Sequence, residues 1–225
     1  MPIYCETALN TLGSFPAEPV NALSSFAPVI FGVLALIFLI RNQHTSKIAY
    51  TLAVLTVLTG LGSVAWHALR TPLTLFLDWL PGAIYLLIIV FFWAYHAGGR
   101  YLGLFLLIAL SGLVFLVPFP IIREYRLFII TGMMVIAAGL LVGTWIRKRR
   151  AFSSAAWMMG AAAIAVSLRT IDLSVCDTIP IGTHFFWHIF LGLAAYAGVR
   201  MMVLLKADGP TAGIRPTGPA PKPTP

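Results

Sequence analysis

Charged residues are scarce in this sequence, and acidic residues are scarcer than basic ones. Asp, Glu, Lys and Arg make up 10% of the 225 residues, whereas soluble domains carry about 25%. Hydrophobic residues make up 60% and the mean hydropathy is +0.93, which excludes an ordinary soluble domain. The net charge is +8, but most basic residues stand singly between apolar runs. They therefore indicate membrane topology and not a nucleic-acid-binding surface.

The first 19 residues lack the basic and apolar regions of a cleavable signal peptide, so we expect the first apolar run to remain as a span. A spanning helix needs about 20 mostly apolar residues. Seven segments qualify, at 20–40, 48–69, 73–96, 101–118, 125–146, 152–169 and 184–205. The sequence predicts an all-α, seven-helix membrane domain over residues 20–205. It lies between an external segment (1–19) and a disordered Pro/Gly-rich cytoplasmic tail (206–225).

The distribution of Lys and Arg predicts the orientation of this bundle. Four of the fifteen (Arg70, Arg123, Arg126 and Arg169) fall on one side, and the other eleven fall on the opposite side. Because cytoplasmic loops carry the excess of Lys and Arg, the N-terminus is expected outside and the C-terminus inside. Cys5 and Cys176 then share the oxidising side, where they form either a disulfide or two unrelated thiols.

Five polar residues lie at one depth of the expected bundle, near its outer end. Ser63 and His67 are four residues apart on the second span, and His184 and His188 are four residues apart on the seventh. Residues at this spacing share one helix face. Asp78 lies one to two turns into the third span. Three histidines beside a carboxylate are typical of a catalytic zinc site, in which the open fourth position holds a water of lowered pKa.

Each of these residues also has a structural interpretation. His67 alone could be a hydrogen-bonding group between helices, and Asp78 could pair with Arg70 or Arg169. Ser63 could be a small-residue helix contact, because glycines precede it. The histidine pair is harder to explain without a metal. Haem does not fit, because its two axial histidines approach from opposite faces.

Several segments resemble the motifs of the alkaline ceramidase family, which belongs to the seven-helix superfamily that also holds the adiponectin-type receptors. The segment GLGSVAWHALRTPLTLFLDWLP (60–81) resembles the family's Ser-x-x-x-His…Asp motif, and THFFWH (183–188) resembles its paired-histidine motif. YCET (4–7), AEPVNALSS (17–25) and IDLSVCD (171–177) resemble its remaining signatures. The resemblance runs from about residue 4 to 205.

The resemblance implies a role for each candidate residue. The zinc ligands are His67, His184 and His188. Asp78 is the carboxylate that acts on the zinc-bound water, and Ser63 is its polar partner. The resemblance also implies a Cys5–Cys176 disulfide. The implied reaction is hydrolysis of the ceramide amide to sphingosine and a fatty acid.

A calcium site is the part of the family pattern that this sequence matches only partly. Glu6 and Glu18 match it, whereas Ile3 and Ala8 stand where Asp and Asn ligands are expected. Two carboxylates are few for a cation that takes six to eight oxygens. The short loops and the Pro-rich tail favour a prokaryotic member in a bacterial inner membrane, whose natural substrate can be an N-acyl lipid other than ceramide.

Three functions are consistent with these features to different degrees. The leading hypothesis is a zinc-dependent intramembrane amidohydrolase that acts on ceramide or a related N-acyl lipid. The alternative is a lipid receptor or sensor of the same fold with a structural zinc. A small-solute transporter would show inverted repeats and broken helices, and the sequence shows neither.

Overall fold

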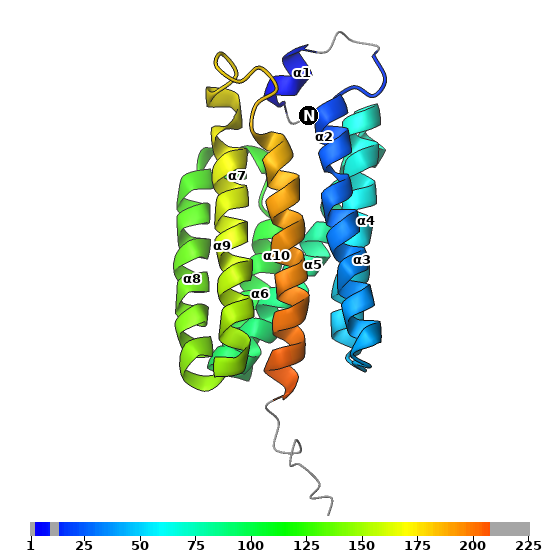
Figure 1. Ribbon diagram of the computed structural model, residues 1–225. Coiled ribbons are helices and arrows are strands. Elements are labelled where there is room, and N and C mark those ends of the chain that lie inside the picture. Colours follow the sequence, from blue (N-terminus) through cyan, green and yellow to red (C-terminus); the bar gives the residue numbers. More distant parts are fainter. Residues whose placement is uncertain (1–2, 10–13, 208–225) are drawn as a thin grey trace, which may run out of the picture.

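The computed structural model describes residues 3–9 and 14–207, and within these residues the regular structure is entirely helical. The helices are α1 (Cys5–Leu9), α2 (Pro19–Ser24), α3 (Phe26–Arg41), α4 (Lys47–Leu69), α5 (Pro72–Gly98), α6 (Arg100–Phe115), α7 (Phe119–Glu124), α8 (Arg126–Arg147), α9 (Arg149–Ile171), the 3₁₀ turn η1 (Asp172–Ser174) and α10 (His184–Ala207). The long helices form one bundle, and α1 lies across one of its ends (Figure 1). The predicted all-α class is confirmed.

Six helical stretches of the described chain are long and apolar enough to cross a membrane. They are Pro19–Arg41, Lys47–Leu69, Pro72–Gly98, Leu127–Arg147, Arg149–Ser174 and His184–Lys206. The segment expected at 101–118 is instead a 16-residue helix, α6. At 1.5 Å per residue it is about 24 Å long, against about 30 Å for a hydrocarbon core. Six of the seven expected spans are therefore supported, while a seventh span and the orientation stay predictions.

The connection between α4 and α5 is short, and it joins the two helices at the end of the bundle that carries α1. Arg70 ends α4 in the left-handed conformation, with φ 53° and ψ 41°. Thr71 then begins α5 with a capping box to Thr74, and Pro72 occupies the first turn, where its missing N–H costs nothing. Residues near the end of α4 consequently lie beside residues near the start of α5.

Small residues fill the centre of the bundle, where α10 packs against α9, α3 and α4. Ala35, Ala53 and Ala155 are fully buried. Without large side chains between them, the helices approach closely, as is usual when lipid surrounds a bundle. The bundle interior is therefore tightly packed along much of α10.

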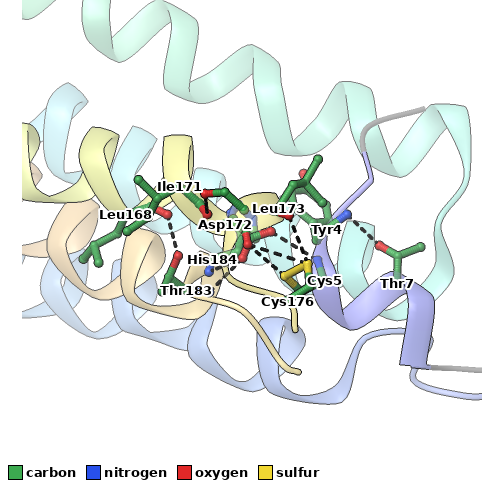
Figure 2. Close-up of a disulfide and its surroundings, with 11 residues drawn as sticks. Tyr4, Cys5, Thr7, Leu168, Ile171, Asp172, Leu173, Cys176, Thr183 and His184 are labelled. Carbon is green, nitrogen blue, oxygen red and sulfur yellow. Dashed lines mark hydrogen bonds between the residues drawn. A yellow bond between two sulfur atoms is a disulfide. The ribbon is translucent and has the colours of Figure 1, made fainter. Parts of the chain in front are cut away.

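A disulfide joins α1 to the loop that precedes α10. Cys5 and Cys176 are bonded with a Cα–Cα distance of 5.2 Å, and 171 residues separate them in the sequence. Figure 2 shows the bridge beside Asp172 and His184. The predicted disulfide is confirmed, and it holds the N-terminal segment over one end of the bundle. Of the predicted tail, only Lys206 and Ala207 fall within the described residues, and they end α10.

Candidate metal centre

Three buried histidines meet at the end of the bundle that the disulfide covers. His67 comes from the last turn of α4, and His184 and His188 come from the first turns of α10. Their side chains are 1–3% exposed, and one nitrogen from each lies within 4.8 Å of the others. Among the described residues this is the group that could hold a metal ion. The predicted convergence of the three histidines is thus observed.

Glu18 fixes the ring of His67. One carboxylate oxygen of Glu18 accepts a hydrogen bond from Nδ1 of His67, which leaves Nε2 for another partner. Burial alone raises the pKa of the Glu18 carboxyl, but hydrogen bonds from His67 and Thr7 and the charge of Arg70 hold it below its usual value. A carboxylate on the second ring nitrogen is the usual support of a metal-ligating histidine.

Serines at the junction of α2 and α3 orient His188. Ser24 Oγ lies 2.8 Å from Nδ1 of His188, and Ser25 Oγ lies 3.4 Å from the same atom. The other ring nitrogen, Nε2, therefore faces the remaining histidines, with Ser63 Oγ at 3.5 Å. Two of the three histidines thus bond outward through Nδ1 and keep Nε2 for a metal.

His184 is held through its backbone and its ring face. Asp172 accepts hydrogen bonds from the N–H groups of Thr183 (2.8 Å) and His184 (2.9 Å), at the start of α10, and from the N–H of Cys5 at 3.2 Å (Figure 2). The ring stacks on Tyr4 with a centroid distance of 4.0 Å. Nδ1 of His184 is buried without a hydrogen-bond partner, which is the state expected of a nitrogen that serves as a metal ligand.

Ser63 and Asp78 lie beside the histidines, as the sequence predicts. Ser63 is 3% exposed and accepts a hydrogen bond from Ser25 Oγ at 3.0 Å. Its hydroxyl also lies near the Asp78 carboxylate of α5. All five predicted residues are therefore in one place. Their catalytic roles stay predictions.

A large apolar cavity begins at this group. Its volume is about 780 Å³, within the range of small-molecule and lipid pockets. Asp78, His184 and His188 line one part of it, and apolar side chains of α5, α6 and α8, such as Trp93 and Leu140, line the rest. Along α5, Asp78 and Trp93 are about 22 Å apart. The cavity is long enough for an acyl chain with its polar end at the histidines.

The expected calcium site does not fit the observed surroundings of Glu6 and Glu18. Both oxygens of Glu6 accept backbone N–H groups of α2, from Val20 at 2.7 Å and Asn21 at 2.8 Å. Glu18 already contacts His67 and Thr7, and it forms an ion pair with Arg70 at 3.1 Å. The guanidinium of Arg70 would repel a calcium ion bound to the same carboxylate. Arg70 therefore already supplies the positive charge that a calcium ion would bring to Glu18.

The sequence alone did not identify every residue that organises the site. Asp172, Ser24 and Ser25 contact the histidines or their backbone, yet none was singled out. Asp172 precedes α10 by 12 residues, so no local capping pattern marks it. The usable signal was the resemblance to the family, because Ser24 and Ser25 lie in its AEPVNALSS signature and Asp172 lies in its IDLSVCD signature.

Three imidazole nitrogens with a nearby carboxylate form a donor set that suits a borderline metal with one open position. The sequence model of a family described as Ceramidase matches residues 4–212, a stretch that includes every residue of the centre. A search of curated proteins gave no match. Since the family model covers most of the chain, this protein belongs to the ceramidase family.

Proposed function

We propose that the protein is a zinc-dependent hydrolase that cleaves the amide bond of ceramide or a related N-acyl lipid inside the membrane. Membership of the ceramidase family supports an activity toward such amides. The observation that carries the proposal is the contact of the histidine group and the Asp78 carboxylate with a long apolar cavity. His67, His184 and His188 would hold the zinc.

A zinc ion held by these three nitrogens would supply Lewis-acid chemistry that activates water near neutral pH. The Asp78 carboxylate would accept a proton from the water that attacks the amide carbonyl. It then returns this proton to the amide nitrogen as the C–N bond breaks, which releases an amine lipid and a fatty acid. Ser63 accepts its own hydrogen bond from Ser25, so its O–H is directed to Asp78 or to the developing oxyanion.

The substrate would enter sideways from the bilayer. Trp79 of α5 and Phe128 of α8 line the cavity and are 44% and 79% exposed, on the surface that faces lipid in a spanning bundle. A membrane lipid could therefore insert its chain without leaving the hydrocarbon. We place the protein in a bacterial inner membrane, with the disulfide and the metal centre on the outer side, as the Lys and Arg distribution favours.

The competing role is that of a lipid receptor or sensor whose zinc is structural. Both roles require bound zinc, so turnover separates them. Purified protein in nanodiscs should release fatty acid from a long-chain ceramide or another N-acyl lipid, with about one zinc per chain. A wild type that binds zinc and lipid but hydrolyses no member of an N-acyl lipid panel would contradict the hydrolase proposal.

A further inference from the structure

Arg169 is a charged side chain of the cavity wall that the proposed mechanism does not use. It lies in the last turn of α9 and lines the cavity together with Asp78, His184 and His188. Its guanidinium carbon lies 4.5 Å from the centre of the Tyr4 ring, and the same ring stacks on His184. A fixed positive charge thus stands at the polar end of the cavity.

The acidic side chains around this end are already engaged by other groups. Asp172 accepts three backbone N–H groups, and Glu18 pairs with His67 and Arg70. Glu6 caps the start of α2. Asp78 lies near both Ser63 and Arg169, but its carboxylate forms no ion pair with Arg169 in the described part of the chain. Within the described residues, Arg169 forms no hydrogen bond or ion pair, and its close contact is the Tyr4 ring.

A half-buried guanidinium that forms no direct ion pair within the described residues has a specific chemical preference. It does not lose its proton, and it presents five N–H donors in a planar fork. This geometry matches a carboxylate or phosphate through two parallel hydrogen bonds. Ceramide carries no anionic group, so it could not form an ion pair with Arg169.

The layout of the cavity separates this charge from the acyl-chain region. The apolar wall runs from the histidines toward Trp93 and Leu140, whereas Arg169 and Tyr4 lie at the covered end. An amide placed at the histidines would direct its acyl chain into the apolar part. The amine side of the lipid would then face Arg169.

We propose that Arg169 binds an anionic group on the amine side of the substrate, so that the preferred substrates are N-acyl lipids with a carboxylate or phosphate near the amide. The predicted effect of Arg169 on turnover rests on the proposed hydrolase function. The predicted effect on lipid binding does not, and it can be tested separately. Arg169 thereby acts as a specificity-determining residue.

The test uses two probes with the same acyl chain, N-palmitoylglycine (anionic) and N-palmitoylethanolamine (neutral). Turnover and dissociation constants are measured for the wild type and for Arg169→Gln in nanodiscs of neutral lipid. The wild type should bind and hydrolyse the anionic probe better. Arg169→Gln should weaken binding and kcat/KM for the anionic probe about 10- to 100-fold, the weight of a charge-assisted hydrogen bond. Values for the neutral probe should change little.

Arg149→Gln is the matched control, because Arg149 also lies over an aromatic ring, that of Trp145 at 4.2 Å, but begins α9 at the opposite end of the bundle. It should leave both probes unaffected. Equal losses of binding and turnover for both probes in Arg169→Gln would show that Arg169 acts through Asp78 or stabilises the fold. This result would overturn the proposal. A wild type that shows no binding preference would also overturn it. A preference in binding without turnover of either probe would support the anion site and contradict the hydrolase function.

Discussion

The backbones of Gly62 in α4 and Leu77 in α5 are in direct contact. A Cβ atom added at Gly62 would lie 2.2 Å from the carbonyl oxygen of Leu77 and 2.8 Å from the backbone nitrogen of Asp78. Only glycine permits this approach. Because Gly62 precedes Ser63 and Leu77 precedes Asp78, the contact sets the separation of the two non-histidine residues of the site.

Gly62→Ala should therefore reduce catalysis without removing the metal ligands. The added methyl group pushes α5 away, which shifts Asp78 relative to Ser63. A displacement of about 1 Å can cost on the order of 10² in rate. Fatty-acid release and zinc content should be measured together. Gly160→Ala is the control, since a Cβ there meets no atom within 4 Å; equal activity of the two variants would show that this contact does not position Asp78.

Asp78→Asn should retain zinc but lose most turnover. The amide keeps the shape of the site but cannot accept the proton of the attacking water, so the rate should fall on the order of 10²–10⁴. Ser63→Ala should cost on the order of 10²–10³ at most. The measurement is the initial rate on the best substrate of the panel. An Asp78→Asn protein with full zinc and the wild-type rate would refute the general-base role.

Replacement of both His184 and His188 by Ala should remove most of the bound metal. Two of the three buried nitrogen ligands are lost, and one imidazole cannot hold zinc against competing chelators. Metal content is measured by mass spectrometry after purification. His96→Ala serves as the control, because His96 lies in the last turn of α5, near the opposite end of the bundle. Unchanged zinc in the double variant would exclude this group as the metal centre.

Calcium chelation should leave the wild-type protein unaffected. Arg70 already supplies a positive charge to Glu18, at 3.1 Å. Neither EGTA nor added calcium should shift the thermal midpoint or the hydrolysis rate. Arg70→Met, in contrast, should lower the thermal midpoint, because it removes one of the two cationic partners of a buried carboxylate. Restoration of activity by calcium after EGTA treatment of the wild type would show that the acidic pair does bind the ion.

The sequence predicted which residues form the site, but it did not predict which residues hold their side chains in position. His184 and His188 are recognisable because their spacing places both on one helix face, and the depth of His67 followed from the order of the spans. The support of His67 by Glu18 joins residues 49 apart in the sequence, and no periodic pattern encodes such a contact. The sequence had related Glu18 only to the family's calcium pattern, which it matches in part, and its contacts with His67 and Arg70 were not predicted.

The fourth apolar segment was predicted too long for a related reason. Hydropathy counts apolar residues, and the stretch 101–118 contains enough of them. Pro118, however, adopts an extended conformation with ψ 140° and begins a separate short helix, as expected of a residue that cannot continue the preceding helix. The position of the proline, and not the hydropathy, decides where α6 ends.

The short α6 also has a consequence for the bilayer. If α6 is the remaining one of the seven predicted spans, its length of about 24 Å would be mismatched with a hydrocarbon core of about 30 Å, and the lipid would adapt by thinning at a cost of a fraction of a kcal/mol per Å. The end of α6 touches the cavity rim, where the rings of Phe115 and Trp79 are 5.7 Å apart. Local thinning of the bilayer at this place would bring headgroups and water closer to the histidines. An amide that normally sits just below the headgroups would then meet the metal at its own depth.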